Sequence, residues 1–207
     1  MGKNIDEKDS RGRTLLINSI VKREQVDSIE SIIKAGANLE LKDKLGDTAL
    51  KKAIKFKRMD VVELLIKNGV NIQSENIEDS PWFFARKNKK IADILVETKG
   101  AIRLTLNKDE ENILEELLYN EDIEDVCSKI EKLDSKEILH AFILEYNYDD
   151  ELLPIVTVLK NDNLKEITAI EIIELLTDGD ISDLKISYEK IFNLINNKYS
   201  DLISRLK

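Results

Sequence analysis

The stretch Lys42-Asp-Lys-Leu-Gly-Asp-Thr-Ala-Leu-Lys-Lys-Ala-Ile54, followed by Met59-Asp-Val-Val-Glu-Leu-Leu-Ile-Lys-Asn-Gly69, decides the fold. A turn around Gly46 leads to Thr48, whose hydroxyl predicts the start of a short helix that ends near Ile54. The second segment predicts another helix, with an apolar side, that ends at Gly69, where a left-handed residue is favoured. A turn–helix–helix unit of this kind cannot bury its apolar side alone, so it requires copies of itself on both sides.

Two further copies surround this stretch. Thr14 lies 34 residues before Thr48, and Ser80 lies 32 residues after it. A small residue follows each of these capping positions by five, and a glycine ends each unit: Ser19, Ala53 and Ala85; Gly36, Gly69 and Gly100. Over about residues 3–100 the chain therefore resembles the ankyrin repeat. The resemblance implies three stacked helix pairs and a role in binding other proteins.

The match to that repeat has one consistent departure. The family prefers Thr-Pro-Leu-His at the start of the first helix. The chain has its leucine position filled by Leu16, Leu50 and Trp82, and its proline once, as Pro81. The histidine never appears, so its usual hydrogen bond to the capping threonine is absent.

Composition limits the class of protein. The chain has 207 residues, of which 42% are apolar and 35% charged, as expected of a globular helical protein. It has no apolar run of the ~18 residues that span a bilayer, and its N-terminus lacks a secretory signal. A single cysteine, Cys127, excludes an internal disulfide and is expected to be a buried, inert thiol. These features predict a cytoplasmic protein without a membrane partner, and the high Ile, Lys and Asn content is typical of AT-rich bacterial genes.

The net charge of −9 conceals a division of the chain. Residues 1–100 carry 20 basic and 16 acidic side chains, a balance of +4, whereas residues 101–207 carry 12 and 25, a balance of −13. The change falls where the repeats end. We therefore predict two domains, ankyrin repeats at 1–100 and an acidic α-helical domain at 101–207.

Basic side chains in the repeats follow the first helix of the second and third units. They are Lys51, Lys52, Lys55, Lys57 and Arg58, then Arg86, Lys87, Lys89 and Lys90. Two interpretations compete: these cations complement the negative end of a helix, or they form a ridge for an anionic partner. The first is favoured, because no aromatic residues alternate with them for base stacking and the whole chain is acidic. We expect no nucleic-acid partner.

The second half predicts about six helices and no strand. Capping boxes start at Asn107 and at Asp134. Residues 164–176 are apolar almost all round, with Glu171 and Glu174 on the polar strip, so this helix is expected to be central. We expect the acidic half to cover the open end of the repeats. The fold class is thus all-α: an ankyrin solenoid of three repeats capped by a helical domain.

A second resemblance covers about residues 136–180. It is carried by Leu139, His140, Phe142, Tyr146, Asn147, Asp149, Asp150 and Pro154, with Thr168-Ala169 further on. These residues are similar to a small bacterial domain family of unknown function with the pattern Leu-His-x-Phe, Tyr-Asn-Trp-Asp-Asp, Pro and a later Thr-Ala. The chain departs from it in having Tyr148 in place of the tryptophan. The resemblance implies an association with toxin–immunity loci.

The same phrase contains residue types that catalysis or metal binding would use, namely His140, Glu145, Asp149 and Asp150. His140 is the only histidine, however, and no glycine-rich phosphate loop is present. A structural histidine and aspartates that cap the following helix are the simpler interpretation. We expect no catalytic residue, no metal and no cofactor.

The leading hypothesis is a bacterial immunity protein that binds and neutralises a toxin domain by occlusion. An acidic surface suits a basic toxin domain such as a nuclease. The alternatives are a general ankyrin scaffold or effector, and an enzyme with a pocket around His140. The predicted partner-binding residues lie at the repeat turns and in the acidic half: Arg11, Arg13, Lys44, Asp47, Glu78, Asp79, Glu121, Asp122, Glu124, Asp125, Asp149 and Asp150.

Overall fold

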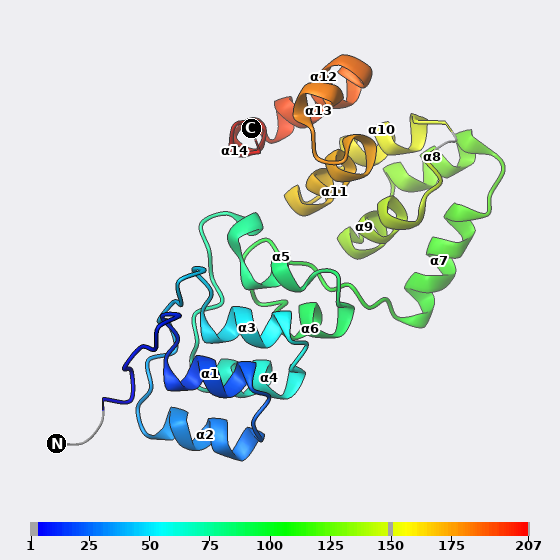
Figure 1. Cartoon of the computed structure of the whole chain (residues 1–207). Coiled ribbons are helices and arrows are strands. Elements are labelled where there is room, and N and C mark those ends of the chain that lie inside the picture. Colours follow the sequence, from blue (N-terminus) through cyan, green and yellow to red (C-terminus); the bar gives the residue numbers. More distant parts are fainter. Residues whose placement is uncertain (1–3, 149–150, 207) are drawn as a thin grey trace. The chain divides into compact units, whose positions relative to one another are not determined.

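The structure, a computed structural model, describes residues 4–148 and 151–206. These residues form fourteen α-helices and one 3-10 helix, and they include no strand. The chain divides into two compact units, Met1–Arg103 and Leu104–Lys207 (Figure 1). We describe each unit by itself.

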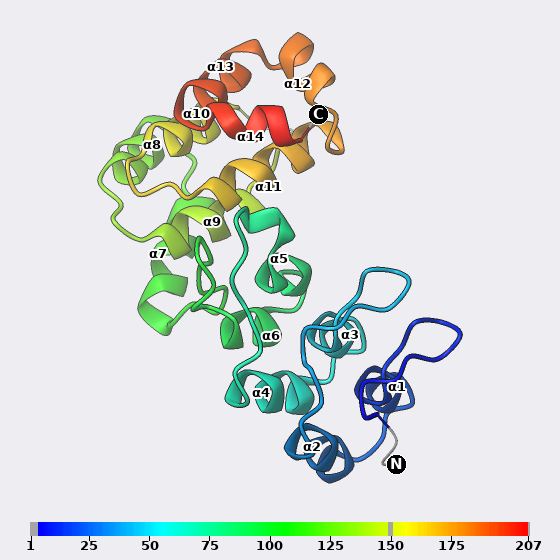
Figure 2. The same cartoon turned by 90° about the vertical axis from the view of Figure 1, so that its left-hand side faces the viewer.

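The first unit consists of three helix pairs. Its helices are α1 (Leu15–Val21) with α2 (Val26–Lys34), α3 (Ala49–Lys55) with α4 (Met59–Lys67), and α5 (Pro81–Ala85) with α6 (Lys89–Ile94); η1 (Ile77–Asp79) precedes α5. The first helices pack in the order α1, α3, α5, and the second helices in the order α2, α4, α6 (Figure 2). The predicted repeating helix pair is therefore present three times.

A hydroxyl starts the first helix of every pair. The Oγ atoms of Thr14, Thr48 and Ser80 accept hydrogen bonds from the backbone N–H three residues on, at 3.3, 3.2 and 3.1 Å. The small residues five positions after these caps, Ser19, Ala53 and Ala85, are at most 2% exposed. The periodic residues in the sequence thus have the predicted roles: the caps begin the helices, and the small side chains lie buried inside the stack.

Polar side chains connect each repeat to the next. The Asp6 carboxylate accepts the N–H of Asn38 at 3.0 Å, the Glu40 carboxylate accepts that of Asn71 at 2.8 Å, and the Gln73 amide oxygen accepts that of Lys99 at 2.9 Å. The turns also meet directly, because the Lys44 N–H donates to the Arg11 carbonyl at 3.1 Å. Gly12 has a φ of +74°, and an added Cβ would lie 3.0 Å from the Lys44 nitrogen, so a side chain here would separate the two turns.

The second unit contains eight helices within its described residues, two more than expected. They are α7 (Lys108–Leu118), α8 (Ile123–Glu131), α9 (Lys136–Glu145), α10 (Leu153–Lys160), α11 (Glu166–Thr177), α12 (Ile181–Ser187), α13 (Glu189–Lys198) and α14 (Ser200–Arg205). Helix α8 packs on α10, α7 on α9, and α9 on α11 (Figure 1). The predicted central helix is α11, whose residues from Ile167 to Ile173 are all buried.

The extra helices arise because the chain after Gly179 is not one helical stretch. It breaks at Tyr188 and at Tyr199, whose φ values are −131° and −136°. At the second break the Tyr199 hydroxyl donates to the Leu164 carbonyl at 2.8 Å, and the Lys198 ammonium donates to the Asn161 carbonyl. These bonds connect the last helices to the segment between α10 and α11.

Three local expectations need correction. The cap of α9 is Ser135, whose Oγ accepts the Ile138 N–H at 3.2 Å, so the capping position lies one residue after Asp134. Glu171 is 2% exposed and lies inside the unit rather than on a polar strip. Cys127 is only partly buried. The capping box at Asn107 and Glu110 is confirmed, with both of its reciprocal hydrogen bonds.

Candidate protein-interaction surfaces

The turn residues predicted to contact a partner differ widely in exposure. Arg11, Lys44 and Asp79 are exposed, whereas Arg13 and Glu78 are half-buried. Asp47 is 1% exposed. A buried carboxylate cannot meet a partner, so we do not retain Asp47 among the proposed contact residues.

Asp47 belongs instead to a buried ion cluster, which we define as Asp43, Asp47 and Lys52. The Lys52 ammonium lies 2.8 Å from Asp43 Oδ2 and 2.7 Å from Asp47 Oδ2, and each of the three side chains is at most 5% exposed. Lys55 adds a second cation, 2.6 Å from Asp47 Oδ2. Burial opposes ionisation of Asp47, but the Lys52 and Lys55 ammonium groups outweigh it and lower its pKa from 3.8 to about 2.

Ion pairs of this kind involve four of the nine basic residues of the predicted ridge, all in the group that follows the second cap. Lys51 also lies 3.5 Å from Asp47 Oδ1, and the Arg58 guanidinium lies 2.7 Å from Asp60 Oδ2. The positive charge after α3 is therefore largely compensated by carboxylates of the same repeat. Lys52 and Lys55 lie in the last turn of α3, as the helix-end interpretation expected. Sequence spacing did not reveal their common partner, Asp47, in the preceding turn.

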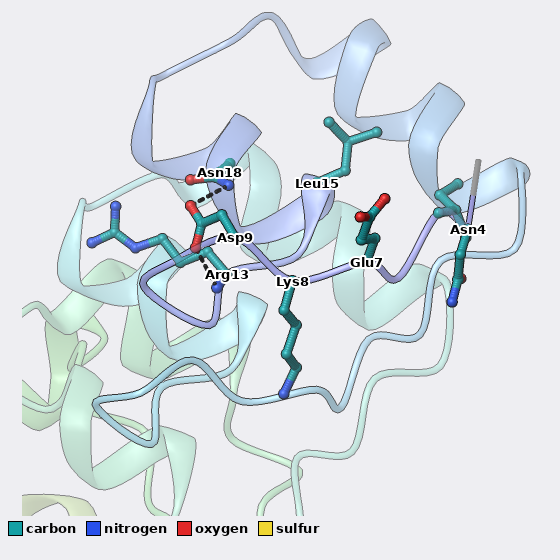
Figure 3. Close-up of a pocket in the computed structure, with 8 residues that line it drawn as sticks. Asn4, Glu7, Lys8, Asp9, Arg13, Leu15 and Asn18 are labelled. Carbon is teal, nitrogen blue, oxygen red and sulfur yellow. Dashed lines mark hydrogen bonds between the residues drawn. The ribbon is translucent and has the colours of Figure 1, made fainter.

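A hollow opens beside the first repeat, between the N-terminal segment and α1 (Figure 3). It has a volume of about 440 Å³, and its lining includes Asn4, Glu7, Leu15 and Asn18. Asp9 forms one wall: its carboxylate accepts N–H bonds from Arg11 and Arg13 at 2.8 and 2.9 Å and the Asn18 amide at 3.0 Å. The Asp9 carboxylate thus already accepts hydrogen bonds from neighbouring residues of the first repeat.

Apolar side chains are exposed on the repeat unit. Leu15 in α1 is 51% exposed, Leu45 at a turn tip is 76% exposed, and Phe84 in α5 is 41% exposed. The Lys51 ammonium lies 3.9 Å from the centre of the Phe84 ring. These exposed apolar side chains are candidate contacts for another protein.

The four carboxylates predicted around the start of α8 are all exposed, but two of them have local functions. Asp122 caps α8, and its Oδ1 accepts the Glu124 and Asp125 N–H groups at 3.0 and 3.1 Å. Asp125 lies 2.6 Å from the Lys129 ammonium. Glu121 and Glu124 are therefore the better candidates for contact with a partner. Asp149 and Asp150, predicted for the same surface and as a helix cap, lie outside the described residues.

An open groove lies beside these carboxylates, at the end of α7 and the start of α8. Its volume is about 640 Å³, and Leu118, Tyr119, Glu121, Ile123, Tyr146 and Glu151 line it among others. Tyr119 is 83% exposed. Sequence analysis did not identify this groove, since Tyr146 and Glu151 reach it from a distant part of the chain.

Most of the described residues of the second sequence resemblance are buried. Leu139, His140 and Phe142 are at most 3% exposed, and Pro154 is also buried. His140 Nδ1 lies 3.0 Å from Thr168 Oγ1, which joins the two separate parts of the pattern. The Tyr146 ring lies 5.0 Å from that of Phe142, its hydroxyl donates to the Glu151 carbonyl at 2.7 Å, and Asn147 is exposed.

Within residues 4–148 and 151–206, no group of three or more His, Cys, Asp or Glu side chains is placed to hold a metal ion. No described helix combines the length and the apolar character that crossing a membrane requires.

Comparison with known proteins finds a likeness in part of the first unit. A family model described as ankyrin repeats (3 copies) matches residues 1–76. The match ends just before η1, and the third helix pair continues the same capped pattern. No curated protein matches the chain. The N-terminal part therefore carries ankyrin repeats, a non-catalytic protein-interaction fold, within an all-helical chain.

Proposed function

We propose that this chain is a bacterial immunity protein that binds a toxin domain in the cytoplasm and neutralises it by covering its functional surface. The coarser statement, that the chain contains a protein-interaction module, follows from its ankyrin repeats. The toxin partner is the further step. In this proposal residues 1–100 form the repeat domain and residues 101–207 the acidic domain.

One observation carries the proposal: the acidic charge is concentrated on part of one unit. Residues 109–128 contain nine acidic side chains and no lysine or arginine. Glu121 and Glu124 are exposed, so their negative charges can attract a basic protein. A nuclease domain, which must itself bind phosphates, is a partner of this kind.

The resemblance of residues 136–180 to a domain found at toxin–immunity loci supports the same proposal. Residues of its pattern contact one another inside the acidic domain, as the 3.0 Å contact between His140 Nδ1 and Thr168 Oγ1 illustrates. The pattern would therefore maintain the domain, while exposed positions around it would contact the partner.

The test uses the genes beside the one that encodes this chain. Each neighbouring reading frame is expressed from an inducible promoter, with and without this chain, and growth is measured. We expect one neighbour to arrest growth and the chain to restore it, and the purified pair to form a 1:1 complex by light scattering. If no neighbour is toxic, or if the chain relieves no toxicity, the immunity role is wrong.

The alternative is a general ankyrin scaffold or effector. The exposed Leu15, Leu45 and Phe84 on the repeat unit favour it, because apolar contacts at these positions would serve any protein partner. A scaffold predicts several partners of moderate affinity. It also predicts that cells survive deletion of its gene while all neighbouring genes remain intact.

A further inference from the structure

We propose that the groove lined by Leu118, Tyr119, Glu121, Ile123, Tyr146 and Glu151 docks a short basic segment of a protein partner, with an apolar side chain inserted between arginines or lysines. This inference rests on the proposed function in taking the occupant to be a protein. It adds where on the acidic domain that protein binds and by which chemistry.

The shape and lining of the groove fit an apolar side chain. Its volume of about 640 Å³ lies within the range of ligand-binding clefts, ~300–1,000 Å³. Leu118 and Ile123 are half-buried, so each still presents apolar surface to solvent. Tyr119 is 83% exposed and would gain most from being covered, since tyrosine contributes a large rigid surface at little entropic cost.

Tyr146 gives the groove a fixed wall. Its ring lies 5.0 Å from the Phe142 ring and 6.2 Å from the Tyr148 ring. Its hydroxyl donates to the Glu151 carbonyl at 2.7 Å, which also places the backbone of Glu151 at the rim. A wall held by ring contacts and a hydrogen bond needs little ordering when a partner binds, and this lowers the entropic cost of association.

The charge of the rim selects the occupant. Glu121 and Glu151 line the groove, both are exposed, and Glu124 is exposed beside them. The nearest cation of α8, Lys129, is already paired with Asp125 and Glu116 at 2.6 and 2.7 Å. An acidic or neutral segment would gain nothing from this rim, whereas arginine or lysine on either side of an apolar residue would pair with it.

The probe is an acetylated hexapeptide in which a Leu-Trp pair is flanked by two arginines on each side. It is titrated into the full-length, ¹⁵N-labelled chain and followed by amide chemical shifts. We expect saturable shifts centred on residues 117–123 and on Tyr146. Shifts spread equally over other acidic segments such as residues 178–183, or no saturable shift at all, would overturn the proposal.

Two variants separate the contributions of charge and of apolar contact. Glu121→Gln with Glu151→Gln is expected to weaken peptide binding roughly fivefold, as for the loss of two exposed ion pairs. Tyr119→Ser, at a position too exposed to affect folding, is expected to weaken binding by a similar factor. The matched control is Asp178→Asn with Glu189→Gln, which removes the same charge from exposed positions away from the groove.

A peptide in which glutamates replace the arginines is expected to produce no saturable shift. Equal binding of the two peptides, or an equal loss of affinity in the control variant, would overturn the proposal. These results are independent of the growth assay. If the chain neutralises a toxin but does not bind the peptide, the proposed function stands and the docking proposal is wrong. If it binds the peptide but neutralises no toxin, the docking proposal stands and the immunity role is wrong.

Discussion

At the scale of single residues, the ion cluster of Asp43, Asp47 and Lys52 is the feature with the clearest consequence for stability. Two carboxylates share one buried ammonium, and Asp43 Oδ1 also accepts the Leu45 and Asp47 N–H groups at 2.9 and 3.0 Å. The cluster thus joins the turn before α3 to the body of the helix. Removing its only buried cation would leave two charges without compensation in a dry site.

We therefore predict that Lys52→Met lowers the free energy of unfolding by about 3–5 kcal/mol, the usual cost of breaking a buried pair. The matched control is Lys55→Met, because the Lys55 side chain is 50% exposed and contacts only Asp47 of the two carboxylates. Its cost is expected to be about 1 kcal/mol or less. Urea denaturation of the full chain measures both, and equal midpoints for the two variants would contradict the description of the cluster as a buried one.

The lowered pKa of Asp47 predicts a loss of stability in acid. Its pKa falls from 3.8 to about 2 on folding, so its ionised form stabilises the folded state above pH 4. That contribution, about 2 kcal/mol by linkage, is lost as the pH falls from about 4 toward 2. We expect the free energy of unfolding of Asp47→Asn to change less over this window than that of the unaltered chain. Parallel pH dependences for the two proteins would contradict the assignment.

At the scale of helices, the stack depends on leucines between neighbouring repeats. Leu50 in α3 and Leu65 in α4 are 1% and 0% exposed. Leu50→Ala and Leu65→Ala are each expected to cost ~2–5 kcal/mol, from lost burial and the cavity left behind. Leu45→Ala is the control at a turn tip, where the side chain is 76% exposed. Denaturant midpoints unchanged within error in both core variants would rule out the repeat packing.

The position of a helix start gives a sharper test. Ser135 caps α9 through its hydroxyl, whereas Asp134, the residue expected from sequence, is exposed and forms no capping bond to α9. Ser135→Ala is expected to cost about 1 kcal/mol of unfolding free energy, and Asp134→Ala only a few tenths. Thermal or urea unfolding measures both variants. A larger loss of unfolding free energy in Asp134→Ala than in Ser135→Ala would show that Asp134 is the capping residue.

Sequence analysis predicted correctly the features that depend on interactions between residues a few positions apart. The caps at Thr14, Thr48 and Ser80 were predictable because an N-cap hydroxyl acts on the N–H three residues on. The breaks at Tyr188 and Tyr199 were not, because helical spacing continues through them and the second is held by the distant Leu164 carbonyl. Glu171 was placed outside for a similar reason: periodicity on an almost wholly apolar helix does not reveal which side faces the neighbouring helices.

The candidate site divides in the same way. The acidic excess was visible by counting, but the groove was not, since it brings residues 117–126 together with Tyr146 and Glu151. The ion cluster was likewise hidden, although its members Asp47 and Lys52 are only five residues apart, because their inward direction depends on the packing of the repeat. Charge content can thus be predicted from the sequence, whereas a groove or a buried ion cluster becomes visible only when the positions of distant side chains are known.

At the scale of the whole molecule, the proposed function gives the −13 balance of residues 101–207 a long-range role: it would raise the rate of encounter with a basic partner. Glu121 and Glu124 test this best, because changing Asp122 or Asp125 would also remove a helix cap or an ion pair. For Glu121→Lys with Glu124→Lys, we expect association with the toxin domain to slow several-fold at low salt and to differ little at high salt. The control, Glu63→Lys with Glu97→Lys, makes the same change in net charge at exposed positions of the repeat unit. Stopped-flow association rates that fall equally in both variants would assign steering to net charge alone, and rates insensitive to both variants and to salt would remove the argument for a basic partner.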